Sequence, residues 1–428
     1  MVFLPFLIMV VALLIGIPIA FALAGSGILG IYIITGNWNT VLGVLGMVPF
    51  TTVADYSFTT IPMFILMAYF SASSGLATDL FKAGANWLAH IRGGLGAATV
   101  FACGLFGAMS GASTASASVM STIAYPEMRR HGYSEELSAG TVGIGATLDL
   151  LIPPSIPMVI YGIATQTSIA KLLIAGVVPG IIAGIFLFLT VFAWVHIRPQ
   201  DAPETYRVTR EERWKSVTRI WPALLLIAII MVLLYTGIVT ATEVAAVGTF
   251  MAALIGVVLG RLNWTGAFQA LKLTLKTSAM IFTILIGANI FGAYMAMSRV
   301  PQQIVSVVAD MELNRWVVVI GIAVSYFVIS MFMDEIPLLL LTLQLTFPLI
   351  VRLGFDPIWF GVLSIMLVCM GLVFPPVGVV AFVVSATAKV DLMKVFTGTS
   401  ILMIALVITT VLIMIFPQLV LWLPQTMR

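Results

Sequence analysis

Apolar residues run through this chain in long stretches that few polar residues interrupt. An α-helix needs about 20 mainly apolar residues to cross a membrane, and several stretches approach that length. The stretches that predict membrane-spanning helices are 3–23, 24–36, 57–75, 220–238, 243–260 and 277–298. Each half of the chain therefore begins with three candidate spans, and a more irregular region follows them.

The main polar stretch, from His196 to Arg219, divides the chain nearly in half and predicts a linker at 199–219. Two other stretches are amphipathic: TDLFKAGANWLAHIRGG, from Thr78, and NWTGAFQALKLTLK, from Asn263. A helix with one apolar and one polar face is typical of the membrane interface, so we expect one interface helix in each half.

Two proline pairs interrupt apolar stretches, in LLIPPSIPMVIYG, from Leu150, and in GLVFPPVGVVAFV, from Gly371. Proline lacks a backbone N–H and disfavours helix at the residue before it. Neither stretch can therefore form one continuous helix, and we expect a broken helix in each half.

The two halves match when one is shifted along the other by 222 residues, the separation of Pro153 and Pro375. At this shift YPEMRRHGY, from Tyr125, falls on FPLIVRLGF, from Phe347, so that a proline, an arginine and a glycine coincide. The match needs no gap over about fifty residues. It indicates an internal repeat.

Before each proline pair lies a stretch that suits neither a lipid-facing helix nor an exposed loop. In the first half it is CGLFGAMSGASTASASVM, from Cys103, and in the second half it is MFMDEIP, from Met331. Irregular backbone at membrane depth is tolerated where it is buried in protein or lines a cavity. We therefore expect a re-entrant hairpin in each half, with its tip near mid-membrane.

If each hairpin returns to its own side, each half crosses the membrane an odd number of times and the second half is inverted. On this topology one side holds 5 of the 20 lysines and arginines, and the other side holds the remaining 15. The five are Lys171, Arg299, Arg315, Arg352 and Arg428. Because basic residues concentrate in cytoplasmic loops, the richer side is expected to be cytoplasmic and both termini periplasmic. The first hairpin then enters from the cytoplasm and the second from the periplasm.

Composition agrees with this picture, since 61% of the residues are hydrophobic and 9% are charged, against roughly 25% charged in soluble domains. We expect an all-α integral membrane protein, whose inverted repeats with broken helices are typical of secondary transporters.

The sequence has no glycine-rich phosphate loop for ATP-driven transport. It also lacks a metal-spaced set of His and Asp and a nucleophile with a base in reach, so we expect neither an enzyme nor a cofactor. A channel is disfavoured, because hairpins that enter from opposite sides suit alternating access.

Each helix break can supply cation ligands. Carbonyls freed around Pro153–Pro154, together with the hydroxyls of Ser110, Ser113, Thr114 or Ser155, are the oxygen ligands that sodium requires. The helix that restarts after the break points its positive end into the same space. The second half offers MDEIP opposite FPPVG as an equivalent site. An anionic solute can then lie between the two, held by helix N-termini and hydroxyls. The alternative interpretation is that the small residues only allow close helix packing.

Four acidic residues fall inside apolar stretches, where a carboxylate is costly and marks a candidate for function. Asp334 and Glu335 stand at the predicted hairpin tip, where they can coordinate a cation or bond to backbone amides. Glu243 follows the end of a span, which favours a helix-capping role. For Asp149, four residues before the proline pair, protonation, helix-end bonding and ion coupling remain open. Asn289, at mid-span, is interpreted as an interhelical hydrogen bond, with contact to the solute as the alternative.

The chain resembles the large membrane subunit of tripartite ATP-independent periplasmic transporters in five stretches: RGGLGAATVFACGLFGAMSGASTASA, PEMRRHGY, LIPPSIPMVIYG, YTGIVTATEVAAV and FPPVGVVAFVV. The resemblance implies a sodium-coupled, elevator-type importer of a small organic acid, such as sialic acid or a C4-dicarboxylate, in the bacterial inner membrane. It implies two partners, a small membrane subunit and a soluble periplasmic binding protein that delivers the solute. A related ion-coupled transporter of organic anions that acts alone, without a binding protein, remains the alternative.

The resemblance also implies a division of the chain and a set of site residues. Scaffold parts are expected at 1–92 and 220–315, and transport parts at 93–198 and 316–428, joined by a cytoplasmic linker at 199–219. The first sodium site comprises Ser110, Gly111, Ala112, Ser113, Pro153, Pro154 and Ser155. The second comprises Asp334, Glu335, Pro337, Pro375, Pro376 and Val377. The solute is expected at Ser113, Thr114, Ser155, Asn289 and Gly378.

Four residues depart from the family pattern. Cys369, Phe374 and Val380 stand where many members have Glu, Thr and Asn. Asp149 stands where a glycine is expected. The resemblance therefore implies a second site that coordinates differently or depends on Asp334, or an unusual solute.

Overall fold

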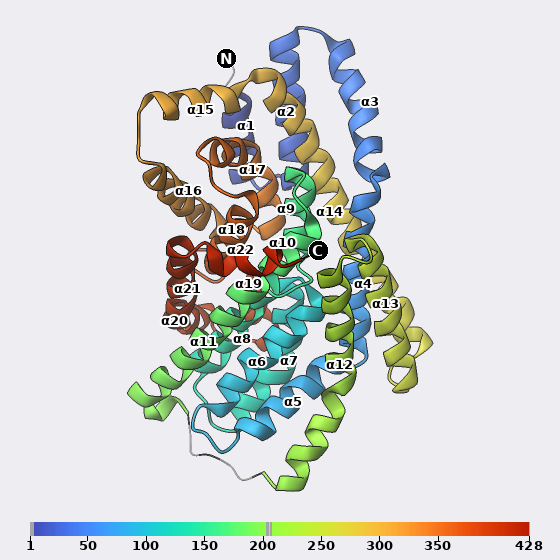
Figure 1. Cartoon of the computed structure of the whole chain (residues 1–428), viewed down its shortest axis with the longest axis vertical. Coiled ribbons are helices and arrows are strands. Elements are labelled where there is room, and N and C mark those ends of the chain that lie inside the picture. Colours follow the sequence, from blue (N-terminus) through green and yellow to red (C-terminus); the bar gives the residue numbers. More distant parts are fainter. Residues whose placement is uncertain (1–3, 203–204, 206–207, 428) are drawn as a thin grey trace.

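The computed structural model describes residues 4–202, 205 and 208–427, and these residues form helices and connecting segments without a strand (Figure 1). Arg428 and part of the predicted linker lie outside the described residues. The helices of the first half are α1 (Leu4–Leu14), α2 (Ile19–Thr35), α3 (Trp38–Ala54), α4 (Thr60–Ser73), α5 (Leu76–Leu88), α6 (Gly94–Ser110), α7 (Ser113–Arg130), α8 (Glu135–Thr147), α9 (Ile156–Thr165), α10 (Ile169–Ala175) and α11 (Val177–Ile197). Those of the second half are α12 (Arg210–Thr236), α13 (Ala241–Val258), α14 (Trp264–Ser298), α15 (Val300–Asp310), α16 (Arg315–Ser330), α17 (Glu335–Arg352), α18 (Pro357–Gly371), α19 (Val379–Ala388), α20 (Leu392–Leu402), α21 (Ile404–Ile415) and α22 (Gln418–Gln425).

The shift of 222 residues relates helices along most of the chain, well beyond the segment matched in sequence. Helix α2 starts at Ile19 and α13 at Ala241, while α7 starts at Ser113 and α17 at Glu335. Helices α8 and α18 begin at the same separation. The internal repeat is therefore confirmed.

Equivalent helices of the two halves interlock. Helix α14 packs along α2, and α13 packs along α4, which is the reciprocal pairing that a two-fold repeat requires. Small residues let these backbones approach closely. A Cβ on Gly27 would lie 2.9 Å from the backbone of Phe291, and one on Gly287 would lie 2.2 Å from the carbonyl oxygen of Ala20.

Two predictions for the first half were wrong. The break between the first two helices falls at Gly16–Pro18 and not at residues 23–24, because Gly16 has a φ of +89° and Pro18 cannot donate to a helical ladder. Residues 37–56 were expected between spans, yet most of them form α3, which meets the following helical segment at a bend of 54°.

The second half differs from its prediction in three places. The amphipathic stretch 263–276 and the span 277–298 form one helix, α14, of 35 residues. The predicted interface helix was therefore wrong at this position, and the counterpart of α5 is α15 instead. Helix α12 already starts at Arg210, inside the predicted linker, because Thr209 and Glu212 form a capping box there.

Two helix hairpins enter the molecule from opposite ends. In Figure 1, α6 and α7 occupy the lower half of the view and α16 and α17 the upper half. The first hairpin turns between Ser110 and Ser113, and the second between Ser330 and Glu335. Each is followed by a broken helix, α8–α9 or α18–α19.

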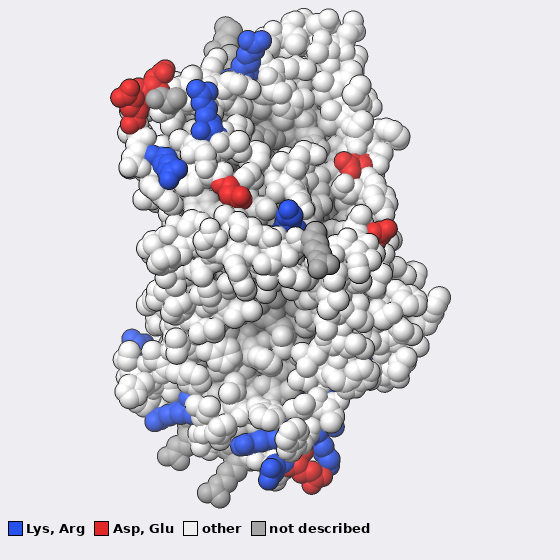
Figure 2. Space-filling model, in the orientation of Figure 1, with Lys and Arg blue, Asp and Glu red and all other residues white. Residues whose placement is uncertain are grey.

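The surface suits a membrane. Among the described residues, six helices are long and apolar enough to cross one, or up to seven if the bent segment 38–73 counts as one span. Large apolar side chains such as Phe50 and Val258 are 74% exposed. Figure 2 shows that the charged side chains on this face are scattered over the upper half and gathered near the lower end, with a largely uncharged band between these two groups. The protein is thus an all-α, multi-pass integral membrane protein with inverted repeats.

Candidate cation and substrate site

The tip of the first hairpin turns at a glycine. Helix α6 ends at Ser110, Gly111 has a φ of +63°, and α7 begins at Ser113. A positive φ of this size is favourable for glycine alone. The tip docks on the first helix break, where the Ile156 N–H donates to the Gly111 carbonyl at 3.2 Å. A Cβ on Gly111 would lie 2.4 Å from the Pro154 carbonyl oxygen, so the two segments leave no room for a side chain.

The first break is buried and capped by a serine. The short turn Leu148–Leu150 leads to the pair Pro153–Pro154, whose peptide bond is cis. Helix α9 restarts at Ile156, and the Ser155 Oγ accepts a hydrogen bond from the Met158 N–H at 3.4 Å. The Ser155 hydroxyl therefore caps its own helix.

Asp149 ties the first break to the first hairpin. Its side chain is fully buried. The Ser110 hydroxyl donates to Asp149 Oδ2 at 2.6 Å, and the Ser116 hydroxyl donates to the same oxygen. Asp149 Oδ1 has no hydrogen-bond partner in the described part of the chain. A Cβ on Gly107 would lie 2.3 Å from this oxygen, so glycine is needed on α6 where the carboxylate approaches.

The tip of the second hairpin docks on its own helix break, as the first tip does. Asp334 Oδ1 accepts a hydrogen bond from the Glu335 N–H at 3.0 Å, so Asp334 makes the bond to a backbone amide that the sequence suggested. The tip docks on the second break, where the Gly378 N–H donates to the Met331 carbonyl at 3.0 Å. Gly378 is the counterpart of Ile156 at the shift of the repeat. Each tip is thus held by its own break through an equivalent donor.

The two hairpin tips meet. The Ser113 hydroxyl donates to Glu335 Oε1 at 3.5 Å, and these residues are 222 positions apart. A second pair with the same separation lies at the breaks, where the Cys369 thiol donates to the Thr147 carbonyl at 3.3 Å. Two contacts between equivalent residues place the pseudo-two-fold axis of the repeat between the hairpins and the breaks. Glu335 is 4% exposed, and its Oε2 has no hydrogen-bond partner among the described residues.

A cavity of about 370 Å³ opens beside the tips. One wall consists of the hairpin tips and the start of α9, and the other consists of α4 and α14. The lining residues are Ile65, Ala68, Tyr69, Ala72, Phe106, Ser110, Ala112, Thr114, Ala115, Ser118, Val119, Ile156, Thr277, Met280, Ile281, Asp334, Glu335 and Ile336. None of them is Lys, Arg or His. We call this space the tip pocket.

Some of the predicted site residues line the tip pocket, and others lie outside its lining. Those that line it are Ser110, Ala112, Thr114, Asp334 and Glu335. Ser113 lies at the meeting point of the tips. The predicted residues outside its lining are Gly111, Pro153, Pro154, Ser155, Asn289, Pro337, Pro375, Pro376, Val377 and Gly378.

Two polar residues outside the hairpins were missed by the sequence analysis. The hydroxyls of Tyr69, on α4, and Thr277, on α14, lie 3.2 Å apart on the far wall of the tip pocket. Ser118 follows Thr114 by four residues and so lies on the same face of α7. That spacing was the one available signal for Ser118, whereas nothing in the sequence connects Tyr69 to Thr277.

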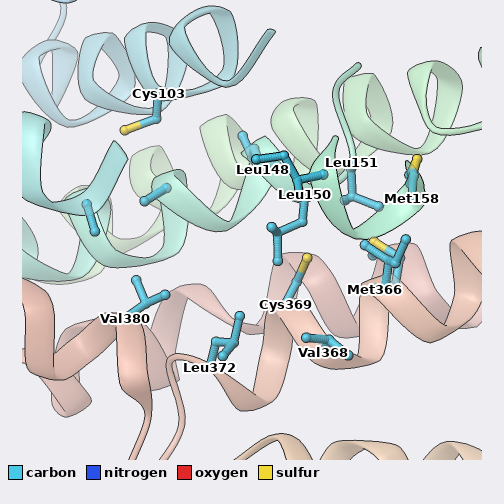
Figure 3. Packing of buried hydrophobic residues seen from close by; sticks show 14 of the residues in the cluster. Cys103, Leu148, Leu150, Leu151, Met158, Met366, Val368, Cys369, Leu372 and Val380 are labelled. Atoms are coloured by element: carbon cyan, nitrogen blue, oxygen red, sulfur yellow. The ribbon is translucent and has the colours of Figure 1, made fainter. Parts of the chain in front are cut away.

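The departures from the family pattern fall in an apolar interior. Cys369 and Val380 are fully buried, and the ring of Phe374 packs 5.4 Å from that of Phe327. Figure 3 shows Leu148 and Leu150 of the first half facing Cys369 and its neighbours. Cys369 and Val380 thus have apolar surroundings, whereas Phe374 is half-buried and Pro376 in the second break is exposed. The acidic groups of this half lie at Asp334 and Glu335.

Two other intramembrane candidates have structural partners. Glu243 accepts a hydrogen bond from the Thr240 N–H at 2.7 Å within a capping box, which confirms its capping role. The Asn289 amide donates to the Thr52 hydroxyl at 2.9 Å and so joins α14 to α3, which confirms the interhelical interpretation.

Inverted halves with two hairpins and two broken helices define a secondary transporter. The chain belongs to the family described as "Tripartite ATP-independent periplasmic transporter, DctM component", whose profile matches residues 6–419. It is therefore a transporter subunit and not an enzyme.

The C4-dicarboxylate large permease protein DctM of Pseudomonas aeruginosa is 35% identical over 344 residues, 80% of each chain. The ectoine large permease protein TeaC of Halomonas elongata is 31% identical over 417 residues, 97% of each chain.

A solved structure supports the fold. The YdaH transporter of Alcanivorax borkumensis superposes with a TM-score of 0.61 at 14% identity, covering 88% of this chain and 89% of that one. At this identity the likeness concerns the arrangement of helices alone.

Proposed function

We propose that this protein is the membrane permease of a sodium-coupled importer, which receives a small organic acid from a periplasmic binding protein and carries it across the bacterial inner membrane. The observation that carries the proposal is the contact of Ser113 with Glu335 at 3.5 Å beside the tip pocket. It joins two inverted hairpins where a transporter of this architecture holds its cargo.

Sodium coupling is supported by two buried carboxylates, each of which has one oxygen without a partner in the described chain. Glu335 Oε2 and Asp149 Oδ1 are without hydrogen bonds among the described groups. A buried charge needs a compensating partner, and a small hard cation with oxygen ligands supplies one. Asp149 lies beside the first tip, with Ser110, Gly111, Ala112, Ser113, Pro153, Pro154 and Ser155. Glu335 lies in the second tip with Asp334 and Pro337, and the second break adds Pro375, Pro376 and Val377. These residues would hold the ions.

An elevator movement is supported by the position of the tip pocket. Its walls come from two groups of helices: the hairpins with α9 on one side, and α4 with α14 on the other. We assign 93–198 and 316–428 to a moving transport part, and 1–92 and 220–315 to a fixed scaffold. Sliding of one part past the other would carry a solute at this border across the membrane.

The orientation follows from the distribution of basic residues. The linker 199–219 and most of the lysines and arginines face the cytoplasm, and both termini face the periplasm. The solute then arrives at the side where a soluble binding protein can dock. The family description names a tripartite, periplasmic system, which supports a small membrane subunit and a binding protein as the two partners.

The proposal is tested with the purified permease and its small subunit in proteoliposomes. Uptake of a panel of organic acids is measured with and without the binding protein, and with a sodium gradient switched on or off. We expect uptake that requires both the gradient and the binding protein. Uptake that persists without the binding protein would support a transporter that acts alone, and uptake without sodium would contradict the coupling.

A further inference from the structure

The polar groups of the tip pocket are unevenly distributed. Asp334 and Glu335 contribute two carboxylates from the second hairpin, while no Lys, Arg or His is present among the lining residues. The remaining polar lining consists mainly of hydroxyls, such as Thr114, Ser118 and Tyr69. A pocket for a solute that carries only negative charge would be expected to offer more cationic than acidic side chains.

Glu335 points to a ligand rather than to a structural bond. It is 4% exposed, it lines the tip pocket, and its Oε2 has no partner in the described chain. Its other oxygen receives one long hydrogen bond of 3.5 Å from Ser113. Burying a carboxylate with one oxygen unpartnered and the other weakly bonded is costly, so a bound group is expected to complete this site.

One sodium ion does not neutralise the two carboxylates of the second tip. Asp334 and Glu335 are adjacent and together contribute two negative charges, of which one monovalent cation neutralises one. The N-terminus of α17, which starts at Glu335, adds a partial positive charge of about one half. When both carboxylates are ionised, a net negative charge therefore remains beside the second tip with sodium bound.

The start of α7, which adjoins Glu335 through Ser113, suits a carboxylate. Helix α7 begins at Ser113, and its first residues Thr114 and Ala115 line the pocket. Helix α9 begins at Ile156, which also lines it. The start of α7 has no side-chain cap, and unpaired N–H groups at such an end bind anions. At α9 the Ile156 N–H is bonded to the Gly111 carbonyl and the Met158 N–H to Ser155, so α9 adds only the positive end of its dipole. Apolar side chains, among them Ile65 and Ile281, complete the lining.

We infer that the solute carried by this protein is a small zwitterion, whose cationic group binds at Glu335 and whose carboxylate binds at the adjoining N-terminus of α7. The inference rests on the proposed function and adds the charge class of its cargo. A dianion of similar size would place its second carboxylate against Asp334 and Glu335, where like charges repel.

The test compares solutes of matched length on the purified permease with its small subunit in saturating sodium. The probes are 4-aminobutyrate, glycine betaine and ectoine as zwitterions, and succinate and glutarate as dianions. Thermal unfolding is followed as each is titrated. We expect the best zwitterion to reach half-saturation at a concentration at least tenfold below that of the best dianion. Dianions that bind as tightly as zwitterions would overturn the inference.

Glu335→Gln separates the solute from the ion, because it keeps the shape and the acceptor for Ser113 but removes the charge. We expect it to reduce the preference for zwitterion over dianion by tenfold or more. A role in sodium binding alone would weaken both classes equally and leave the preference unchanged, which would overturn the inference.

Glu243→Gln is the matched control. Glu243 is an exposed acidic residue on α13, and glutamine can also complete its capping box. It should leave the preference as in the unchanged protein. If neither class gives sodium-dependent binding or uptake, the proposed importer itself fails. If dianions alone are bound and carried with sodium, only the inference about charge class fails.

Discussion

Ser113 and Glu335 lie 222 residues apart in the chain, yet the Ser113 hydroxyl donates to the Glu335 carboxylate at 3.5 Å. They occupy the same position in the two copies of the repeat, at the first residue of α7 and of α17. A contact between equivalent residues can form only near the axis that relates the copies. The hairpin tips therefore meet on that axis, and both proposed ion sites lie beside it.

Loss of one tip hydroxyl or carboxylate should weaken sodium binding. We expect Ser113→Ala and Asp334→Ala each to raise the sodium concentration for half-maximal uptake about tenfold, since a ligand worth ~1.4 kcal/mol changes affinity tenfold. Ser325→Ala is the control, because among the described residues the Ser325 hydroxyl bonds to the Gly321 carbonyl of its own helix and to no other group. Unchanged sodium dependence in both tip variants would remove these residues from the ion sites.

The turn at Gly111 should tolerate no side chain. Gly111→Ala carries the cost of a positive φ, about 1 kcal/mol, and in addition places its Cβ 2.4 Å from the Pro154 oxygen. We expect uptake to fall to background. Gly36 has nearly the same φ, +62°, but nothing within 4 Å of the added Cβ, so Gly36→Ala isolates the backbone cost. Equal uptake by the two variants would show that the tip does not need to dock on the break.

Asp149 should hold the first hairpin in place. In Asp149→Ala the hydroxyls of Ser110 and Ser116 lose their shared acceptor, which we expect to destabilise the protein by ~2 kcal/mol. Asp149→Asn keeps an acceptor and should be destabilised by less. Thermal unfolding and hydrogen exchange at residues 107–116 measure both effects. An alanine variant with unchanged stability and exchange would show that the carboxylate does not position the tip.

Much of this architecture could be predicted from the residues that interrupt the apolar stretches of the sequence. The proline pairs, the hydroxyl cluster around Ser113 and the acids at Asp334 and Glu335 identify both breaks and both tips, because each breaks a rule for lipid-facing helices. The shift of 222 residues, seen between Pro153 and Pro375, turned out to relate helices over most of the chain. These features are local, so a sequence displays them.

Other features depend on how distant helices pack. Residues 37–56 did not stand out as a span, because Pro49 interrupts the apolar pattern of α3 and the polar residues Asn37 and Asp55 flank it. The far wall of the tip pocket joins Tyr69 to Thr277 across 208 residues, and no spacing rule connects them. The partner of Asp149 could not be chosen in advance either, since Ser110 and Ser116 approach it only after the hairpin folds back.

The central claim is that the two halves are inverted, and sided labelling tests it most directly. Arg130 and Arg352 are equivalent residues at the outer ends of the two hairpins. Cysteines are introduced as Arg130→Cys and Arg352→Cys, one at a time, in a chain whose own cysteines, Cys103 and Cys369, are buried. A membrane-impermeant thiol reagent is then applied to sealed vesicles of known orientation. Our account predicts labelling of position 130 from the cytoplasmic side only and of position 352 from the periplasmic side only. Labelling of both positions from the same side would contradict it.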